Sequence, residues 1–261
     1  MAAALAALGW LAVVNAVVPA AAYVTGEHRT RRAGRAWPAR RTAAFLAAVV
    51  VLGAATSGAL DDRARASLAW HMTQQMTLLF VVPLGLIAGG PGELLGRSGA
   101  RRAWRPSPAA LAGAWLALAA VQWVVHVPSV LDELWSRPAA LAAVHWALVA
   151  AGAAFFGCAF AAVSSGRLHP LAAALYVVST MPATDAIGLW LLFDPSAVYE
   201  RYAGAGAIAD QHRAGAVMFT AGMVPLFLAA RMAYGWISKG GDARLSRRQP
   251  AGTLRRPLDL G

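Results

Sequence analysis

The sequence contains a single cysteine, Cys158, and a single lysine, Lys239. One thiol excludes an intramolecular disulfide and any metal site built from several thiolates of one chain. A bound metal must therefore be held mainly by histidine, methionine, carboxylate or amide groups. Because Lys239 follows the last apolar segment, the segments that could enter a membrane offer no amine for a Schiff base, which argues against a retinal protein.

Charge is also scarce, since charged residues make up 13% of the chain and hydrophobic residues 59%. A soluble domain usually carries about 25% charged residues. The net charge of +11 could suggest nucleic acid as a partner. However, the basic residues lie in short gaps between long apolar runs, as in a membrane protein. The composition therefore predicts a protein of the lipid bilayer that does not bind nucleic acid.

Seven apolar stretches are long enough to cross the hydrocarbon core as helices, which takes about 20 residues each. The sequence thus predicts an all-α membrane protein, a bundle of seven transmembrane helices within residues 1–238. A basic tail at 239–261 lacks apolar periodicity and is expected to be disordered. The expected spans are approximately 3–24, 42–60, 68–90, 108–127, 139–163, 170–193 and 212–236.

The first stretch has no Lys or Arg before it, so it lacks the basic start of a cleaved signal peptide. We therefore expect it to be retained, with cleavage near Ala20-Ala21-Ala22 as the alternative. The basic residues also predict the orientation, because the side richer in Lys and Arg faces the cytoplasm. The N-terminus is expected outside and the C-terminus inside. The poorer, outer side holds only Arg63, Arg65, Arg137, Arg201 and Arg213.

Four of the six histidines fall at the outer ends of the expected helices. Imidazole is the commonest metal ligand, and ionisable groups in a bilayer usually face the bundle interior or a wet cavity. Four imidazoles at similar depth on four helices therefore indicate a candidate metal site. The alternative is that each is an ordinary interfacial residue. The four are His71, His126, His145 and His212.

The segment around His71 adds an amide and two thioethers. Residues three and four apart share a helix face, so His71 lies beside Gln75, and Met72 lies beside Met76. Imidazole together with thioether suits Cu(I). The alternative role of the two methionines is to fill gaps in the packing.

Two carboxylates are candidates for supporting roles. Asp185 lies well inside the sixth expected span, where a carboxylate needs a partner or a proton. It either bonds to a ligating histidine or stabilises a helix contact. Asp210 lies just before the seventh span, where it either caps that helix or supports the site. The sequence leaves both pairs of alternatives open.

In these segments the chain resembles the integral-membrane cytochrome c oxidase assembly factors of the CtaG type, a seven-helix family linked to copper-dependent maturation of the oxidase. The likeness runs in order from about residue 40 to 236. The family patterns are His-Met-x-Gln-His, His-x-Pro, a histidine in the next helix, Met-Pro, and Asp-Gln-Gln-x-Ala-Gly-x-x-Met-Trp. The matching segments here are His71-Met72-Thr73-Gln74-Gln75, His126-Val127-Pro128, His145, Met181-Pro182 and 210–219.

One departure from the family pattern is that its second motif histidine is Gln75 here. Two histidines one turn apart form a ready metal face, and an amide oxygen is a poor substitute toward Cu(I). Either His212, which stands where the family has glutamine, compensates for the loss, or metal binding is weakened.

The resemblance implies a membrane assembly factor or copper metallochaperone, not an enzyme, that supports maturation of a terminal cytochrome c oxidase in a bacterial plasma membrane. The implied cofactor is copper, held stably or in transit, and the implied partners are oxidase subunits and a copper donor protein. A b-type cytochrome with the same histidines as haem ligands, or a transporter, is the alternative. The expected metal ligands are His71, His126, His145, His212, Met72 and Met76, supported by Gln75, Asp185 and Asp210.

Overall fold

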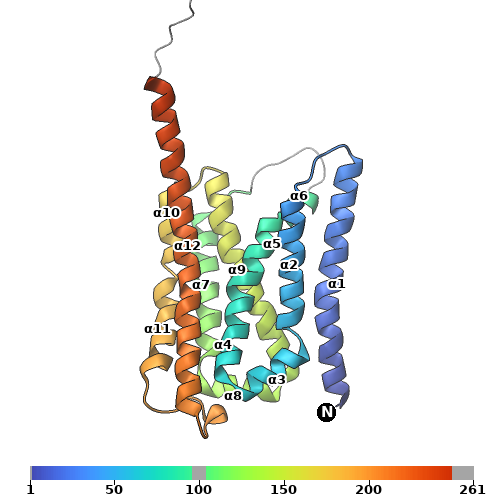
Figure 1. Cartoon of the computed structure of the whole chain (residues 1–261), viewed down its shortest axis with the longest axis vertical. Helices are drawn as coiled ribbons and strands as arrows, with labels where there is room; N and C mark the ends of the chain where they lie inside the picture. The colour runs from blue at the N-terminus through green and yellow to red at the C-terminus, as the bar shows by residue number, and fades with distance from the viewer. Residues whose placement is uncertain (1, 96–103, 249–261) are drawn as a thin grey trace, which may run out of the picture.

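The computed structural model of the chain describes residues 2–95 and 104–248, with side chains for 13–94 and 104–238. Within these ranges the chain forms helices and no strand, so the all-α prediction is confirmed (Figure 1). The elements are α1 (Ala2–Arg32), α2 (Ala39–Ala55), α3 (Gly58–Ala66), α4 (Leu68–Met76), the π-helical turn η1 (Thr77–Val81), α5 (Val82–Gly89), α6 (Pro91–Leu95), α7 (Pro108–Val125), α8 (Pro128–Ser136), α9 (Pro138–Ser164), α10 (Pro170–Val178), α11 (Met181–Phe193), the 3-10 turn η2 (Glu200–Tyr202) and α12 (Ala207–Arg248).

Five helical segments of the described chain are long and apolar enough to cross a membrane. A sixth candidate arises if α2 and α3, which are bent by 55° to each other, are counted as one span. The set fits a multi-pass membrane protein. The expected first span is part of α1, but side chains 3–12 lie outside the described ones. Seven spans and the orientation therefore stay predictions. The five segments are Leu68–Leu94, Pro108–Val125, Pro138–Ser164, Pro170–Phe193 and Ala207–Ser238.

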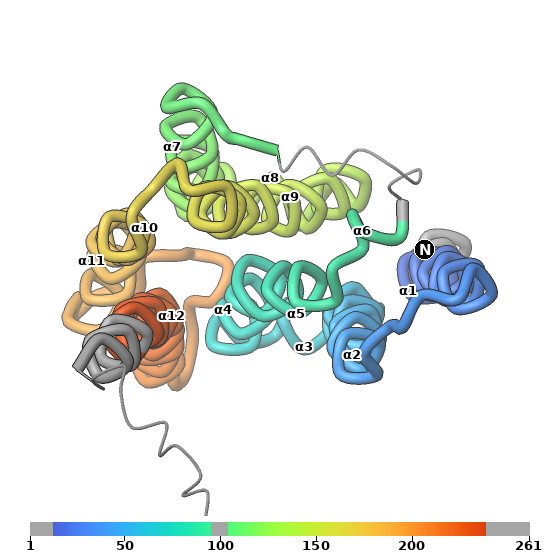
Figure 2. Tube along the Cα trace, turned by 90° about the horizontal axis from the view of Figure 1, so that it is seen from above, coloured from blue at the N-terminus to red at the C-terminus, as the bar shows by residue number. Residues whose placement is uncertain are grey.

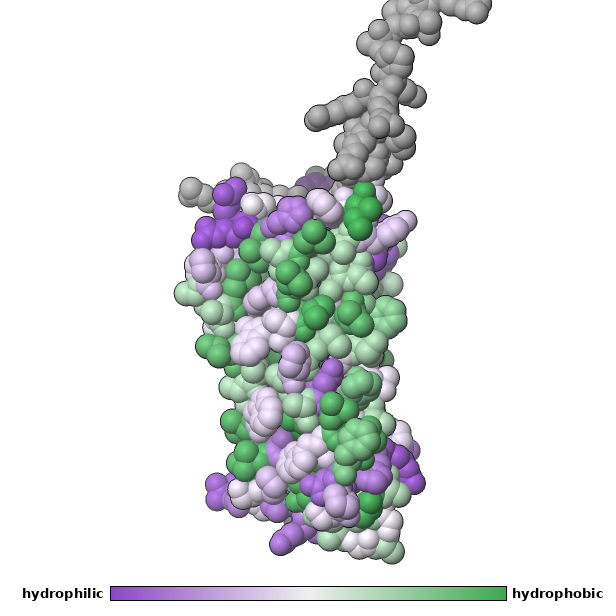
Figure 3. Space-filling model, turned by 90° about the vertical axis from the view of Figure 1, so that its left-hand side faces the viewer, coloured by the Kyte–Doolittle hydropathy of each residue, from purple (hydrophilic) through white to green (hydrophobic). Residues whose placement is uncertain are grey.

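The long segment made of α4, η1 and α5 lies at the centre of the bundle. It packs against α2, α9 and α12, while α1 lies at the edge beside α2 (Figure 2). Helices α3 and α8 lie at one end of the bundle, which we call the α8 end, and α6 lies at the other (Figure 1). On the face that Figure 3 presents, hydrophobic side chains cover most of the middle, and hydrophilic side chains gather toward both ends. This distribution is typical of a membrane-spanning bundle.

The π-helical turn η1 has a local cause. Pro83 has no backbone N–H, so the carbonyl of Leu79 has no donor four residues later in the chain. The helix accommodates this with a wider turn, in which the Val82 amide donates to the Thr77 carbonyl, five residues earlier. Helix α9 packs directly against this turn. A Cβ atom at Gly152 would overlap the Leu79 carbonyl oxygen, so only glycine permits the contact.

Two expected boundaries differ from the structure. The span predicted at 42–60 ends at Ala55, because Ser57 caps a new helix, α3, by accepting a hydrogen bond from the Leu60 amide. The span predicted at 170–193 keeps its bounds, but its helix is interrupted between α10 and α11, next to Pro182. The last helix begins at Ala207 instead of 212, directly after Gly206, which has a positive φ of 83°.

The tail predicted after residue 238 is partly described. Its residues 239–248 continue the backbone helix of α12, whereas 249–261 lie outside the described residues. The division of the chain at residue 238 therefore stays a prediction.

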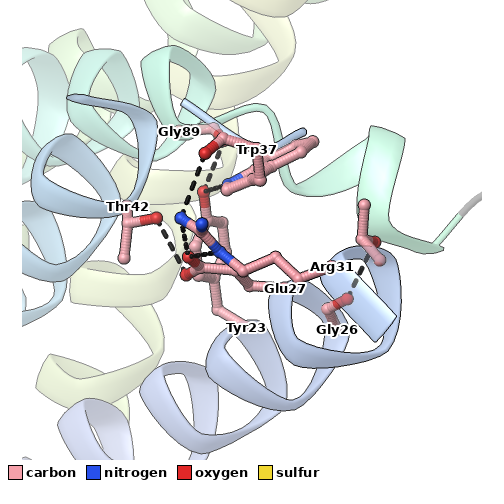
Figure 4. A network of polar contacts seen from close by, with 8 residues as sticks. Tyr23, Gly26, Glu27, Arg31, Trp37, Thr42 and Gly89 are labelled. Carbon is pink, nitrogen blue, oxygen red and sulfur yellow. Dashed lines mark hydrogen bonds and ion pairs between the residues drawn. The ribbon is translucent and has the colours of Figure 1, made fainter. Parts of the chain in front are cut away.

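A polar network fastens α1 to the core at the end opposite α8 (Figure 4). The Tyr23 hydroxyl donates to the Gly89 carbonyl at the end of α5 (2.8 Å) and accepts from the Trp37 indole N–H (3.1 Å). Glu27 of α1 accepts from the Thr42 hydroxyl of α2 (2.8 Å). The bond from Tyr23 satisfies the Gly89 carbonyl, which lies at the end of α5.

Candidate functional site

Helix α4, which carries His71, is anchored at its start by α12. The Ser67 hydroxyl donates to one Asp210 carboxylate oxygen (2.8 Å), and the Leu68 amide donates to the other (2.6 Å). Asp210 lies in the first turn of α12, because that helix begins at Ala207. Asp210 therefore does not stand at the N-cap of its own helix, which was one of the two alternatives. It accepts hydrogen bonds from the start of α4, next to Ser67, which is the N-cap residue of that helix.

Met72 of α4 and His126 at the end of α7 are in direct contact. His126 ends α7, and its Nδ1 atom lies 2.5 Å from the Gln122 carbonyl oxygen. A carbonyl only accepts, so Nδ1 carries the proton and Nε2 of the neutral ring has a free lone pair. That Nε2 atom lies 3.2 Å from the Met72 sulfur. Both residues are buried: His126 is 3% exposed and Met72 is 0% exposed. Two electron-pair donors thus face each other in a buried site.

His71 directly precedes Met72 in α4, and its side chain pairs with that of Gln75, one turn later. The His71 Nε2 atom is 2.9 Å from the Gln75 amide nitrogen, so position 75 faces the imidazole as the helical spacing predicted. Nδ1 of His71 and Oε1 of Gln75 are buried without a hydrogen-bond partner among the described residues. The His71 ring also contacts Trp135 of α8, with ring centroids 5.1 Å apart. The side chain is therefore fixed, but one of its nitrogens is unused.

The three buried histidines share the α8 end but do not converge on one point. His126 and His145 are near enough to His71 to act on it electrostatically. Within the described ranges, however, no three His, Cys, Asp or Glu side chains are arranged to hold one ion. The single site that the shared depth of His71, His126 and His145 suggested is therefore not formed in this structure. Each ring has a different neighbour: Gln75, Met72 and a separate small cavity.

The other two expected metal ligands are Met76 of α4 and His212 of α12. Met76 is buried (4% exposed) and lines an open, apolar groove between α4 and α12. His212 is half-buried on α12, and its Nε2 atom has no hydrogen-bond partner in the described part of the chain. Met76 lies one turn from Met72 on the same helix, whereas His212 has no hydrogen bond to the Met72 and His126 pair in the described part of the chain.

Asp185 faces a helix, not a histidine. A Cβ atom at Gly222 of α12 would overlap its Oδ1 atom, so the carboxyl group occupies the space that this glycine leaves. The same oxygen has no hydrogen-bond partner among the described residues. Of the two alternatives for Asp185, the contacts favour the helix contact between α11 and α12.

Several polar residues of the site were missed from the sequence. Gln122 is fully buried, lies one turn before His126 and accepts a hydrogen bond from the Thr184 hydroxyl (3.1 Å). The Tyr199 hydroxyl donates to the His126 carbonyl (3.0 Å). Asp61 is 2% exposed, although the sequence places it in an outer loop. The spacing of four residues between Gln122 and His126 was the one available signal.

Comparison with known proteins gives the family. The model of the cytochrome c oxidase caa3 assembly factor family (Caa3_CtaG) matches residues 21–239. The uncharacterized protein ML1998 of Mycobacterium leprae (strain TN) is 28% identical over 246 residues, which cover 82% of this chain and 36% of that protein. The chain thus spans little more than a third of the length of this relative. No solved structure matches. Because the family model covers most of the chain, the protein belongs to the cytochrome c oxidase caa3 assembly factor family.

Proposed function

We propose that this protein is a membrane assembly factor that binds Cu(I) on its way to a terminal cytochrome c oxidase. The site is centred on Met72 and His126, at the α8 end. The family membership supports the role in oxidase assembly. The copper role is carried by one observation, the buried Met72 sulfur and the His126 lone pair that face each other at 3.2 Å.

The chemistry of this pair selects the ion. Thioether sulfur and neutral imidazole are soft to intermediate donors that suit Cu(I), whereas Mg²⁺ and Ca²⁺ require oxygen. A site with few protein ligands holds its ion loosely enough to release it, which suits transfer more than storage. His71 is the next imidazole along α4 and has an unused nitrogen. It is the residue that would join the pair during loading or release.

The wider assignment follows from the same site. The protein acts without catalysing a reaction, in a bacterial plasma membrane, with the α8 end on the outer side. Its partners are a copper donor protein and subunits of the oxidase. Met76, His145 and His212 are secondary ligands in this proposal, and Gln75 stands where a stronger ligand would bind.

A haem-binding role fits the geometry less well. Axial haem ligands lie on opposite faces of the macrocycle. His126 and Met72 are already 3.2 Å apart, which leaves no room for a porphyrin between them. This pair therefore cannot supply the two axial ligands, and the family membership supports a role in oxidase assembly and not a b-type cytochrome.

The test compares Met72→Leu and His126→Gln with the control Met218→Leu. Met218 is a methionine of α12 with the same 0% exposure as Met72. Cu(I) affinity is measured on the purified chain in competition with a chromogenic Cu(I) chelator, without oxygen. Loss of a ligand should weaken binding by at least about 10-fold, while the control should bind like the wild type.

Copper content and activity of the oxidase in host membranes give the second readout. We expect both to fall with Met72→Leu and His126→Gln. Wild-type Cu(I) affinity in both variants would refute the copper site. Normal oxidase copper together with weakened Cu(I) binding would separate the site from oxidase assembly.

A further inference from the structure

A second polar space lies at the α8 end and is not used by the Met72 and His126 pair. It is a cavity of about 20 Å³, between α1, α3 and α9. A space of this size holds one water-sized particle, because a water needs about 10–15 Å³. Its polar lining consists of Asp61, His145, Thr56 and Asn15, and its apolar lining of Leu141, Ala142 and Trp146.

Asp61 brings a buried carboxylate to this cavity. It is 2% exposed, and its Oδ1 atom accepts a hydrogen bond from the Gln74 amide at 2.6 Å. The same amide donates to the Ala55 carbonyl at 2.7 Å, so its orientation is fixed. Arg65 acts on Asp61 electrostatically, but its guanidinium donates to the Trp135 carbonyl (2.9 Å). A buried carboxylate with one amide donor is costly unless a proton or a cation compensates its charge.

His145 brings an unused imidazole to the same cavity. The residue is 5% exposed, and its Nε2 atom has no hydrogen-bond partner among the described residues. A buried polar atom without a partner is uncommon and calls for an unseen water or ion. The imidazole comes from α9 and the carboxylate from α3, so both helices converge on one small space.

The Asn15 amide donates to the Thr56 hydroxyl at 3.3 Å, which completes the polar part of the lining. Carboxylate oxygen and imidazole nitrogen are donors for first-row divalent cations such as Zn²⁺. As a set of ligands, carboxylate with imidazole is harder than the thioether with imidazole of Met72 and His126.

We propose that Asp61 and His145 bind a divalent first-row cation in this cavity, at a site separate from Met72 and His126. The oxygen atoms of Thr56 and Asn15 are the lining groups that would complete its coordination. The protein thus has two sites of different softness at one end of the bundle. This proposal does not depend on Cu(I) binding at Met72 and His126, because neither of those two residues lines the cavity.

The test uses Zn²⁺ alone as the probe, with the full chain in detergent after removal of metals by a chelator. Zn²⁺ is redox-inert, and sulfur of the thioether type is a poor ligand for it. The wild type should bind one Zn²⁺ per chain at this site. Asp61→Asn keeps an oxygen for the Gln74 bond but removes the charge, and His145→Gln removes the imidazole. Each should weaken Zn²⁺ binding by at least about 10-fold.

Three further variants act as controls. Glu133→Gln removes an exposed carboxylate of α8, and Met72→Leu removes the thioether of the other pair; both should bind Zn²⁺ like the wild type. Ala142→Leu fills the cavity while it leaves both ligands in place, so it should weaken Zn²⁺ binding. Elution volume and circular dichroism identify the variants that keep the fold.

The wild-type chain itself gives a readout that needs no variant. X-ray absorption at the zinc edge should show nitrogen and oxygen ligands with one imidazole. A sulfur neighbour, or wild-type affinity in Asp61→Asn and His145→Gln, would overturn the proposal. Equal loss of Zn²⁺ with Met72→Leu would also overturn it, since a single shared site would explain that result. Cu(I) titration of Met72→Leu in parallel reports on the copper site alone.

Discussion

Replacing Gly152 with alanine should loosen the contact between α9 and the π-helical turn η1. In the structure, a Cβ atom at this position would lie 2.8 Å from Pro83 Cγ and 3.2 Å from the Leu79 carbonyl carbon, and would overlap the carbonyl oxygen. Ordinary carbon contacts lie at about 3.5–4.0 Å. The obstructing atoms belong to the backbone and to a proline ring, so no side chain can turn aside. The two helices must move apart instead.

The magnitude follows from a matched pair of variants. Gly157 lies on the same helix, and a Cβ atom there would meet nothing within 4 Å. Both Gly→Ala changes gain the same helix propensity, about 1 kcal/mol, so this contribution cancels in the comparison. The remaining difference is the cost of overpacking, about 1–3 kcal/mol. Gly152→Ala should therefore be less stable than Gly157→Ala by that amount.

The free energy of unfolding can be measured by titration of the detergent-solubilised protein with sodium dodecyl sulfate, followed by circular dichroism. Gly157→Ala should equal or exceed the wild type, and Gly152→Ala should unfold at a lower fraction of denaturant. If both variants have the same stability, α9 does not approach the η1 turn as closely as the structure indicates.

Asp210→Ala removes the cap of α4 and should lower the free energy of unfolding by about 1–2 kcal/mol, whereas the exposed Asp62→Ala should change it by less than about 0.5 kcal/mol; equal effects would refute the cap. Hydrogen bonds from Ser196 hold the pKa of the Asp194 carboxyl below its usual range, so their stabilisation is present above the ordinary pKa and is lost as the pH falls through the lowered one. An NMR titration should show Ser196→Ala raising this pKa, and no change would contradict the assignment. Gln75→His adds an imidazole one turn from the existing one and should strengthen Cu(I) binding in the chelator assay; unchanged affinity would show that position 75 takes no part.

The sequence predicted the long spans well because each is a continuous apolar run of membrane length. The expected spans 108–127 and 139–163 correspond closely to α7 and α9. The sequence did not predict the bend between α2 and α3. The Ser57 cap at the start of α3 is a single local hydrogen bond, and the apolar pattern around it is still compatible with one continuous helix. The sequence prediction also missed α8, since a nine-residue amphipathic helix at the surface resembles a loop in hydropathy.

In the candidate site, too, a contact within one helix could be predicted from the sequence, whereas a contact between two helices could not. The pairing of His71 with Gln75 was predictable because both lie on one helix, four residues apart. The contact between Met72 and His126 depends on how α4 and α7 rotate and approach, which no local pattern records. Similar depth was therefore a sound indication that the histidines share one end of the bundle. It was a poor guide to which of them meet.

The cap that Asp210 provides to α4 has a consequence for the order of biogenesis. The carboxylate follows the Leu68 amide by 142 residues. At about 5–20 residues per second, synthesis supplies it roughly 7–28 s after that amide. Until α12 is inserted, the first turn of the ligand-bearing helix has no partner for this amide from the rest of the chain. The first turn of the helix that carries His71 and Met72 is thus synthesised early, but it gains this partner only after α12 has entered the membrane.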